Sequence, residues 1–164
     1  MSERSDLLER FRRGAEILAV ATTGAAGAEL DFKPSPEKWN VRTIVCHLAD
    51  SEMVAAMRFR QVIAETNPSL QAFDQDAWAD HLDYSRRKIS QALETFRRVR
   101  GDTYELLKDL PEEAYSRKGT HTEHGELTLL DLLRRFAEHA EKHVRQIQSV
   151  RAAYKEQRAK QAAS

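Results

Sequence analysis

Two histidines spaced four residues apart, His139 and His143, are the residues of this chain whose type and spacing most favour chemistry. They lie in a run that otherwise has the apolar spacing of a core-facing helix. Side chains four apart on a helix project from the same side, so two such imidazoles can bind one divalent cation if a third ligand faces them. His47, in a second core-facing segment, is the best candidate for that ligand.

The same three histidines have a second interpretation that involves no metal. A neutral imidazole buried without a partner is costly, so each histidine needs either a hydrogen-bonding neighbour or a shared cation. Glu138 and Asp50 are helix neighbours that offer such hydrogen bonds. The spacing by itself leaves both interpretations open.

Four long segments with apolar residues at helical spacing must position these histidines. The patterns predict helices over residues 5–22, 41–65, 84–110 and 129 to about 154. Asn40 and Thr128 precede two of these helices as predicted N-caps. A short extra helix is predicted near residues 74–78. No stretch alternates as a strand does, and the tail after Tyr154 is expected to fray.

These segments predict an all-α fold, a four-helix bundle with long inter-helix connections and one short extra helix. Bundles of this kind commonly hold metals between facing helices. The long connections are compatible with an up-down-up-down course and equally with a course that contains a crossover.

Length and charge narrow the classes of function. The 164 residues carry 26 basic and 26 acidic side chains, which suits one domain over residues 1–164. The balanced charge argues against nucleic acid as a partner, and no apolar run reaches the roughly 18 residues of a membrane span. The N-terminus has no apolar signal core, so a cytoplasmic protein is expected.

The single cysteine, Cys46, excludes a cysteine-rich zinc site, and we expect it to be a buried inert thiol.

Two stretches of the chain resemble the DinB/YfiT-like family of metal-dependent helical-bundle enzymes. One runs from Trp39 to Glu52 and contains His47; the other runs from Phe136 to Ile147 and ends His-Val-Arg-Gln-Ile. The family has a tryptophan before its second helix, a histidine inside that helix and an HxxxH pair in its last long helix. The resemblance covers most of the chain and implies that His47, His139 and His143 are metal ligands.

The resemblance also implies an activity. Family members known as enzymes are transferases and isomerases that use low-molecular-weight thiols such as bacillithiol or mycothiol. A three-histidine site suits a thiol-dependent transferase or isomerase and also a hydrolase, because the cation can hold a thiolate or lower the pKa of a bound water. Zinc is the first choice of metal, and nickel and iron also accept imidazole ligands. Members of this family often form homodimers.

Several other residues have no assigned role at this stage. Asp50, Ser51 and Gln146 have the spacing to face the histidines, but roles in solvent or within their helices are equally compatible. His121 and His124 are expected in a loop, either beside the site or solvated, and His81 lies in the connection after the second helix.

The leading hypothesis is a metal-dependent enzyme that acts on a small-molecule substrate. The alternative is a non-catalytic dimeric helical bundle with a vestigial or structural metal site, because no acid, base or nucleophile is identifiable beside the histidines. A DNA-binding role is disfavoured by the balanced charge.

Overall fold

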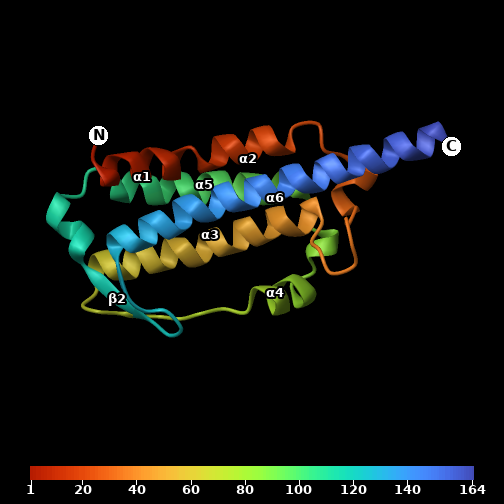
Figure 1. Ribbon diagram of the computed structural model, residues 1–164. Helices are drawn as coiled ribbons and strands as arrows, with labels where there is room; N and C mark the ends of the chain where they lie inside the picture. Colours follow the sequence, from red (N-terminus) through yellow and green to blue (C-terminus); the bar gives the residue numbers. More distant parts are fainter.

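Four long helical rods lie side by side in the computed structural model, which describes residues 1–164 (Figure 1). The rods are formed by α1 (Glu3–Arg12) with α2 (Gly14–Thr22), by α3 (Val41–Ala64), by α5 (Ile89–Leu107) and by α6 (Leu129–Ala163). The predicted all-α four-helix bundle is therefore confirmed. The predicted short extra helix is α4 (Gln75–His81). None of the helices combines the length and the apolar composition that a bilayer span requires.

The connections contain short elements at both ends of the bundle. These are the 3₁₀ turns η1 (Gly27–Asp31), η2 (Tyr84–Arg86) and η3 (Glu112–Ser116), and the strands β1 (Ser69–Leu70), β2 (Lys118–His121) and β3 (Gly125–Thr128). Strand β2 pairs with β1 in parallel and with β3 in antiparallel orientation.

The course of the chain contains a crossover. The first rod and α6 run in one direction, whereas α3 and α5 run in the other (Figure 1). The segment between α3 and α5 therefore returns along the whole bundle before α5 begins (Figure 1). Helix α3 packs against α5 and α6, and the first rod packs against the same two helices from the other side. Of the two predicted courses, the one with a crossover is correct.

The two predicted N-caps fix the starts of the helices that carry the histidines. The Asn40 side chain accepts a hydrogen bond from the Thr43 amide at 2.8 Å, at the start of α3. Thr128 and Asp131 form a capping box at the start of α6. Each cap satisfies amides that the first helical turn leaves without a partner.

A polar layer divides the core into two apolar clusters. One cluster packs around Ile44, Phe96 and Ile147, and the other around Phe59 and Leu133. Between the two clusters lie buried or half-buried polar residues of three helices, namely Asp50, Ser51 and Glu52 of α3, Arg100 and Thr103 of α5, and His139 of α6. Polar side chains in the middle of a bundle need partners there, so this layer is where a site is expected.

Three features of the backbone differ from the sequence predictions. The first predicted helix is two helices that break at Arg13, and the third begins at Ile89, because residues 84–86 form a 3₁₀ turn. The tail predicted to fray continues α6 as an exposed helix to Ala163 (Figure 1).

The three-stranded sheet was not predicted at all. Its strands have two to four residues, too few for a visible alternation. The two inward residues of β2 are Gly119 and His121, neither of which gives an apolar signal. Gly119 is needed because a Cβ there would lie 3.0 Å from the Pro68 carbonyl oxygen on the neighbouring segment.

Candidate metal centre

The structure brings His47, His139 and His143 together between α3 and α6. The Nε2 atom of His139 lies 3.1 Å from that of His47 and 3.1 Å from that of His143. Ligand atoms of all three residues lie within 4.8 Å of one another. Neighbouring ligands of a tetrahedral zinc ion, each about 2.0–2.1 Å from the metal, stand about 3.3 Å apart. The spacing of these nitrogens therefore fits a common cation.

Proton counting argues against a purely hydrogen-bonded cluster. His143 Nδ1 lies 2.7 Å from the Gln146 side-chain oxygen, which can only accept, so His143 donates from Nδ1 and its Nε2 carries a lone pair. His139 Nε2 then either donates to His143 or accepts from His47, because one neutral nitrogen cannot do both. At most one of the two 3.1 Å contacts is therefore an ordinary hydrogen bond, whereas a cation between the rings would use a lone pair of each nitrogen.

Asp50 and Glu138, the alternative hydrogen-bond partners, make no hydrogen bond to the histidines. The Asp50 carboxylate instead accepts from the Tyr84 hydroxyl at 2.7 Å and from Arg87 Nη1 at 2.9 Å. Glu138 lines the adjoining cavity and makes no hydrogen bond to an imidazole. The three rings face one another and not the carboxylates of their own helices.

Burial keeps the three imidazoles neutral, which is the form that binds metal. His47 is 1% exposed and His143 is 7% exposed, whereas His139 is half-buried. Burial and the neighbouring positive charges lower the pKa of His47 to about 3 and that of His139 to about 2. Burial also lowers the pKa of His143, against a smaller opposing effect of the hydrogen bond with Gln146. At neutral pH all three therefore offer lone pairs.

Two neighbouring side chains hold these rings in place. Gln146, one turn after His143 on α6, fixes the orientation and tautomer of that ring. Trp39 lies immediately before α3, and its ring packs against His47 with centroids 5.1 Å apart and lies nearly parallel to His143 at 6.5 Å. Sequence reasoning left Gln146 unassigned, although its spacing of three from His143 was the available signal.

A buried ion pair near the histidines connects all four helical rods of the bundle. Arg100 of α5 and Glu52 of α3 are each 1% exposed and form two hydrogen bonds of 2.8 and 2.9 Å. The same guanidinium donates to the carbonyl oxygens of Phe11 on α1 and Phe136 on α6. Sequence reasoning missed this network, because Arg100 follows two exposed arginines and looks like part of a solvated face.

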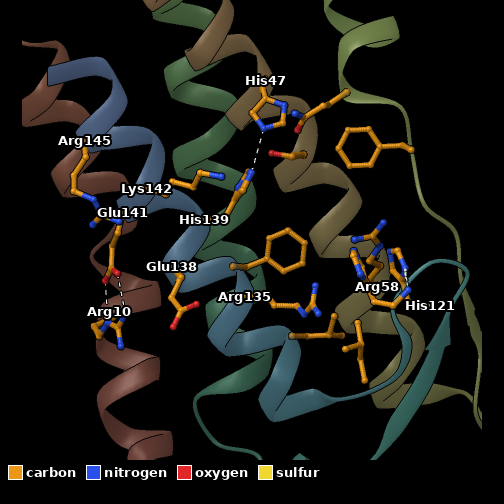
Figure 2. A pocket seen from close by; sticks show the side chains of 17 residues that line it. Arg10, His47, Arg58, His121, Arg135, Glu138, His139, Glu141, Lys142 and Arg145 are labelled. Carbon is orange, nitrogen blue, oxygen red and sulfur yellow. Dashed lines mark hydrogen bonds and ion pairs between the residues drawn. The ribbon is translucent and has the colours of Figure 1, made fainter. Parts of the chain in front are cut away.

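A cavity of about 660 Å³ opens beside the histidines. Figure 2 shows His47 and His139 facing each other at one end of it, and Arg58 beside His121 at the other. Its charged lining comprises the cations Arg10, Arg58, Arg135, Lys142 and Arg145 and the carboxylates Glu138 and Glu141. Arg10 engages Glu141 in a two-point ion pair, which leaves Glu138 as the free carboxylate of the cavity (Figure 2).

The remaining candidate residues divide between the cavity and the rest of the protein. Ser51, His121 and His124 line the cavity. Cys46 is fully buried outside the cluster of potential ligands, and burial raises the pKa of its thiol, as expected for an inert cysteine. His81 is exposed on α4, where its Nδ1 lies 2.9 Å from the Ala77 carbonyl oxygen.

Comparison with known proteins assigns the fold and the family. Residues 10–147 match the family model of the DinB superfamily. A protein of Oceanobacillus iheyensis named "Putative metal-dependent hydrolase" is 30% identical over 122 residues, which cover 74% of this chain and 70% of that protein. The "Putative metal-dependent hydrolase YfiT" of Bacillus subtilis is 29% identical over 121 residues, which cover 73% of this chain and 68% of that protein.

The solved structure of YfiT from Bacillus subtilis has the same fold. It superposes with a TM-score of 0.85 at 24% identity, covering 92% of this chain and 87% of that chain, and is described as a probable metal-dependent hydrolase with an unusual four-helix bundle topology. Because the family model spans most of the chain and all three clustered histidines, this protein belongs to the DinB superfamily, as its sequence resemblance implied.

Proposed function

We propose that this protein is an enzyme whose reaction on a small molecule depends on a divalent cation bound by His47, His139 and His143. The observation that carries the proposal is the convergence of three imidazole nitrogens, two pairs of them 3.1 Å apart, in neutral form at the end of a cavity. The names of the related proteins, which refer to metal-dependent hydrolases, support it.

The donor set narrows the choice of metal. Three neutral nitrogens with no carboxylate in the cluster suit zinc first, and nickel or iron next. A cation with such ligands acts as a Lewis acid on an oxygen or sulfur atom that occupies its open side. His139 is the half-buried member of the three and lines the cavity, so a cation held by these residues would lie next to the space where a substrate binds.

Neither Cys46 nor Ser51 is placed to act as a nucleophile in the cavity. Cys46 does not line it, and the Ser51 hydroxyl is directed to the Leu48 carbonyl oxygen at 3.3 Å. The attacking group therefore comes from outside the chain, as water in hydrolysis or as a low-molecular-weight thiol in a transfer or isomerisation. Glu138 lines the same cavity and no arginine neutralises its charge, so we propose it as the group that accepts a proton from either nucleophile.

The size of the cavity supports a small-molecule substrate. About 660 Å³ falls within the range of roughly 300–1,000 Å³ that is typical of small-molecule sites. Only four of its seventeen lining residues are hydrophobic, which favours a polar substrate over a lipid.

The experiment that tests this function pairs two substrate panels with two variants. Metal-loaded wild-type protein is assayed for hydrolysis of ester, amide and phosphoester substrates and, separately, for addition of bacillithiol or mycothiol to electrophiles. We expect turnover in one panel, loss of that turnover in His139→Ala and a large decrease in Glu138→Gln. Turnover that persists undiminished in His139→Ala contradicts a role for the centre in the reaction.

The same assays address the alternative function, a dimeric helical bundle with a structural metal site. That alternative predicts no turnover in either panel, together with unfolding of the protein when a chelator removes the metal. The proposed enzyme instead keeps its helical circular dichroism without metal, because its core consists of two apolar clusters that do not include the histidines.

A further inference from the structure

Two arginines without acidic partners meet at the end of the cavity remote from the histidines. Arg58 comes from α3 and Arg135 from α6, and both line the cavity. Burial lowers the pKa of Arg58, and the positive charge of Arg135 lowers it further. Neither guanidinium forms an ion pair, although ion pairs engage most of the other arginines of this bundle. Like charges near each other repel, and an anion bound between them would relieve that repulsion.

Arg58 has unused hydrogen-bonding capacity in this position. Its Nη2 donates to the Gln71 carbonyl oxygen at 2.7 Å, which anchors the side chain at the cavity wall. Its Nε–H is buried and has no partner. A buried donor without an acceptor costs free energy, and a small shift of the side chain toward an oxyanion in the cavity would recover it. The preferred acceptor for a guanidinium is an oxyanion with two oxygens in one plane.

The β2–β3 hairpin adds a neutral donor to the same place. His121 Nδ1 accepts hydrogen bonds from the amides of Glu123 and His124 at 3.1 and 3.2 Å, so the proton of the neutral ring is on Nε2. Burial and the charge of Arg58 lower the pKa of His121, which keeps this ring neutral. His121 is 5% exposed and lines the cavity beside Arg58 (Figure 2).

We propose that Arg58, Arg135 and His121 form an anion-binding subsite that holds a carboxylate or phosphate group of the substrate while its reactive group lies at the three-histidine centre. The placement of the substrate's reactive group at the three-histidine centre rests on the function proposed above, whereas anion binding at the subsite does not. The charge of the cavity favours the same class of ligand, because five cationic side chains face two carboxylates and one of these is already paired with Arg10.

The helices also set the approximate length of the substrate. Arg135 precedes His139 by four residues on α6, so the two lie on one side of the helix about 6 Å apart along its axis. Arg58 follows His47 by eleven residues on α3, about 16 Å along that axis. A substrate that reaches both sites must bridge the part of these distances that the arginine side chains do not cover.

The small three-stranded sheet holds parts of the proposed subsite together. Strand β1 pairs with β2 through Leu70 and His121, and the amide of Ala72 donates to the Thr122 side chain at 3.0 Å. These bonds fix the hairpin against the segment that also anchors Arg58 through Gln71. The sheet therefore positions two members of the subsite relative to each other.

Binding of inorganic phosphate and of succinate, measured by titration calorimetry at low ionic strength, tests the subsite. The two probes show whether the subsite takes phosphate, carboxylate or both. The proteins are full-length wild type, Arg135→Gln, Arg58→Gln and, as a control with the same change of charge, Arg98→Gln at an exposed position of α5. All are compared again in a His139→Ala background, which removes the metal centre as a place for the anion.

We expect at least one probe to bind wild type and Arg98→Gln equally, and to bind Arg135→Gln and Arg58→Gln about tenfold or more weakly, as for loss of a charge-assisted hydrogen bond. The same pattern in the His139→Ala background supports the subsite even if the metal-dependent function fails. Equal affinity in all four proteins, absence of binding of both probes, or binding that disappears only with His139→Ala would overturn the proposal. Arg135 is exposed, so Arg135→Gln is expected to fold even if Arg58→Gln does not.

Discussion

His143 donates a hydrogen bond from Nδ1 to the Gln146 side-chain oxygen at 2.7 Å, and this bond aims the lone pair of its Nε2 at His139. Both residues lie on α6, one turn apart, so the helix itself sets the distance. A ligand ring with a fixed tautomer loses little freedom when a cation binds. We therefore expect the bond to contribute to metal affinity without contacting the metal.

Replacement of Gln146 by alanine tests this contribution. We expect Gln146→Ala to weaken metal binding by about 10- to 100-fold, the usual effect of removing a partner of a ligating histidine. Competition with a chromophoric chelator measures the affinity. Gln148→Ala on the exposed side of the same helix is the matched control and should bind as wild type does. Equal affinities of the two variants would show that the Gln146 contact has no part in the site.

The ion pair between Arg100 and Glu52 predicts a large effect on stability. Both side chains are 1% exposed, so Glu52→Gln leaves a buried guanidinium charge without its counterion. We expect the free energy of unfolding to fall by about 3–5 kcal/mol, as for other broken buried pairs. Urea unfolding measures it, with Glu94→Gln in the exposed pair of Glu94 and Arg97 as the control. A midpoint shifted no more than that of the control would contradict this role.

Substitution by alanine is expected to have opposite effects on stability at two glycines. A Cβ on Gly14 would overlap the Arg100 guanidinium, whereas a Cβ on Gly101 would meet nothing within 4 Å. Gly14→Ala should destabilise the protein by about 1–3 kcal/mol through overpacking. Gly101→Ala, within α5, should stabilise it by up to about 1 kcal/mol through helix propensity. Thermal unfolding of both variants checks the pair, and stabilisation by Gly14→Ala would show that Arg100 moves aside freely.

The metal-free protein should lose stability as the pH falls below about 6.5. Unfolded histidines titrate near 6.5, whereas the pKa of His47 is about 3 and that of His139 about 2 in the folded protein. Between these values the unfolded state binds more protons, so the free energy of unfolding is highest above pH 6.5 and declines toward pH 3. Urea unfolding of chelator-treated protein between pH 7.5 and 5, above the range of most carboxylates, measures the slope.

A variant identifies the groups responsible for that slope. His139→Phe removes one depressed pKa, so its stability should fall less steeply over the same interval, whereas His81→Ala, at an exposed histidine, should decline as wild type does. Stability of wild type that stays constant from pH 7.5 to 5 would contradict the buried, neutral state of these rings.

The helices and the three histidines were predictable because they depend on local periodicity. His47 and His143 occupy apolar positions of helical patterns, and residues at such positions face the core wherever the helices pack. The fixed spacing on α6 then brings His139 to the same place. His47 reaches that place because α3 packs against α6.

The parts that escaped prediction depend on contacts between distant segments. The hairpin that carries His121 pairs residues of β2 with β1 about fifty positions earlier, and no local pattern encodes that pairing. Arg100 and Glu52 have the sequence surroundings of surface residues and become partners only when α3 and α5 pack. The break at Arg13 likewise follows from the approach of the Arg100 guanidinium to Phe11 and Gly14.

The metal content of untagged protein tests the central claim most directly. We expect wild type to retain about one divalent ion per chain in elemental analysis, and His47→Ala and His139→Ala to retain almost none. His81→Ala, which removes a histidine that contacts only its own helix, should retain as much as wild type. Full retention in His139→Ala, or no metal in wild type after reconstitution with zinc, nickel and iron, would contradict a three-histidine metal centre.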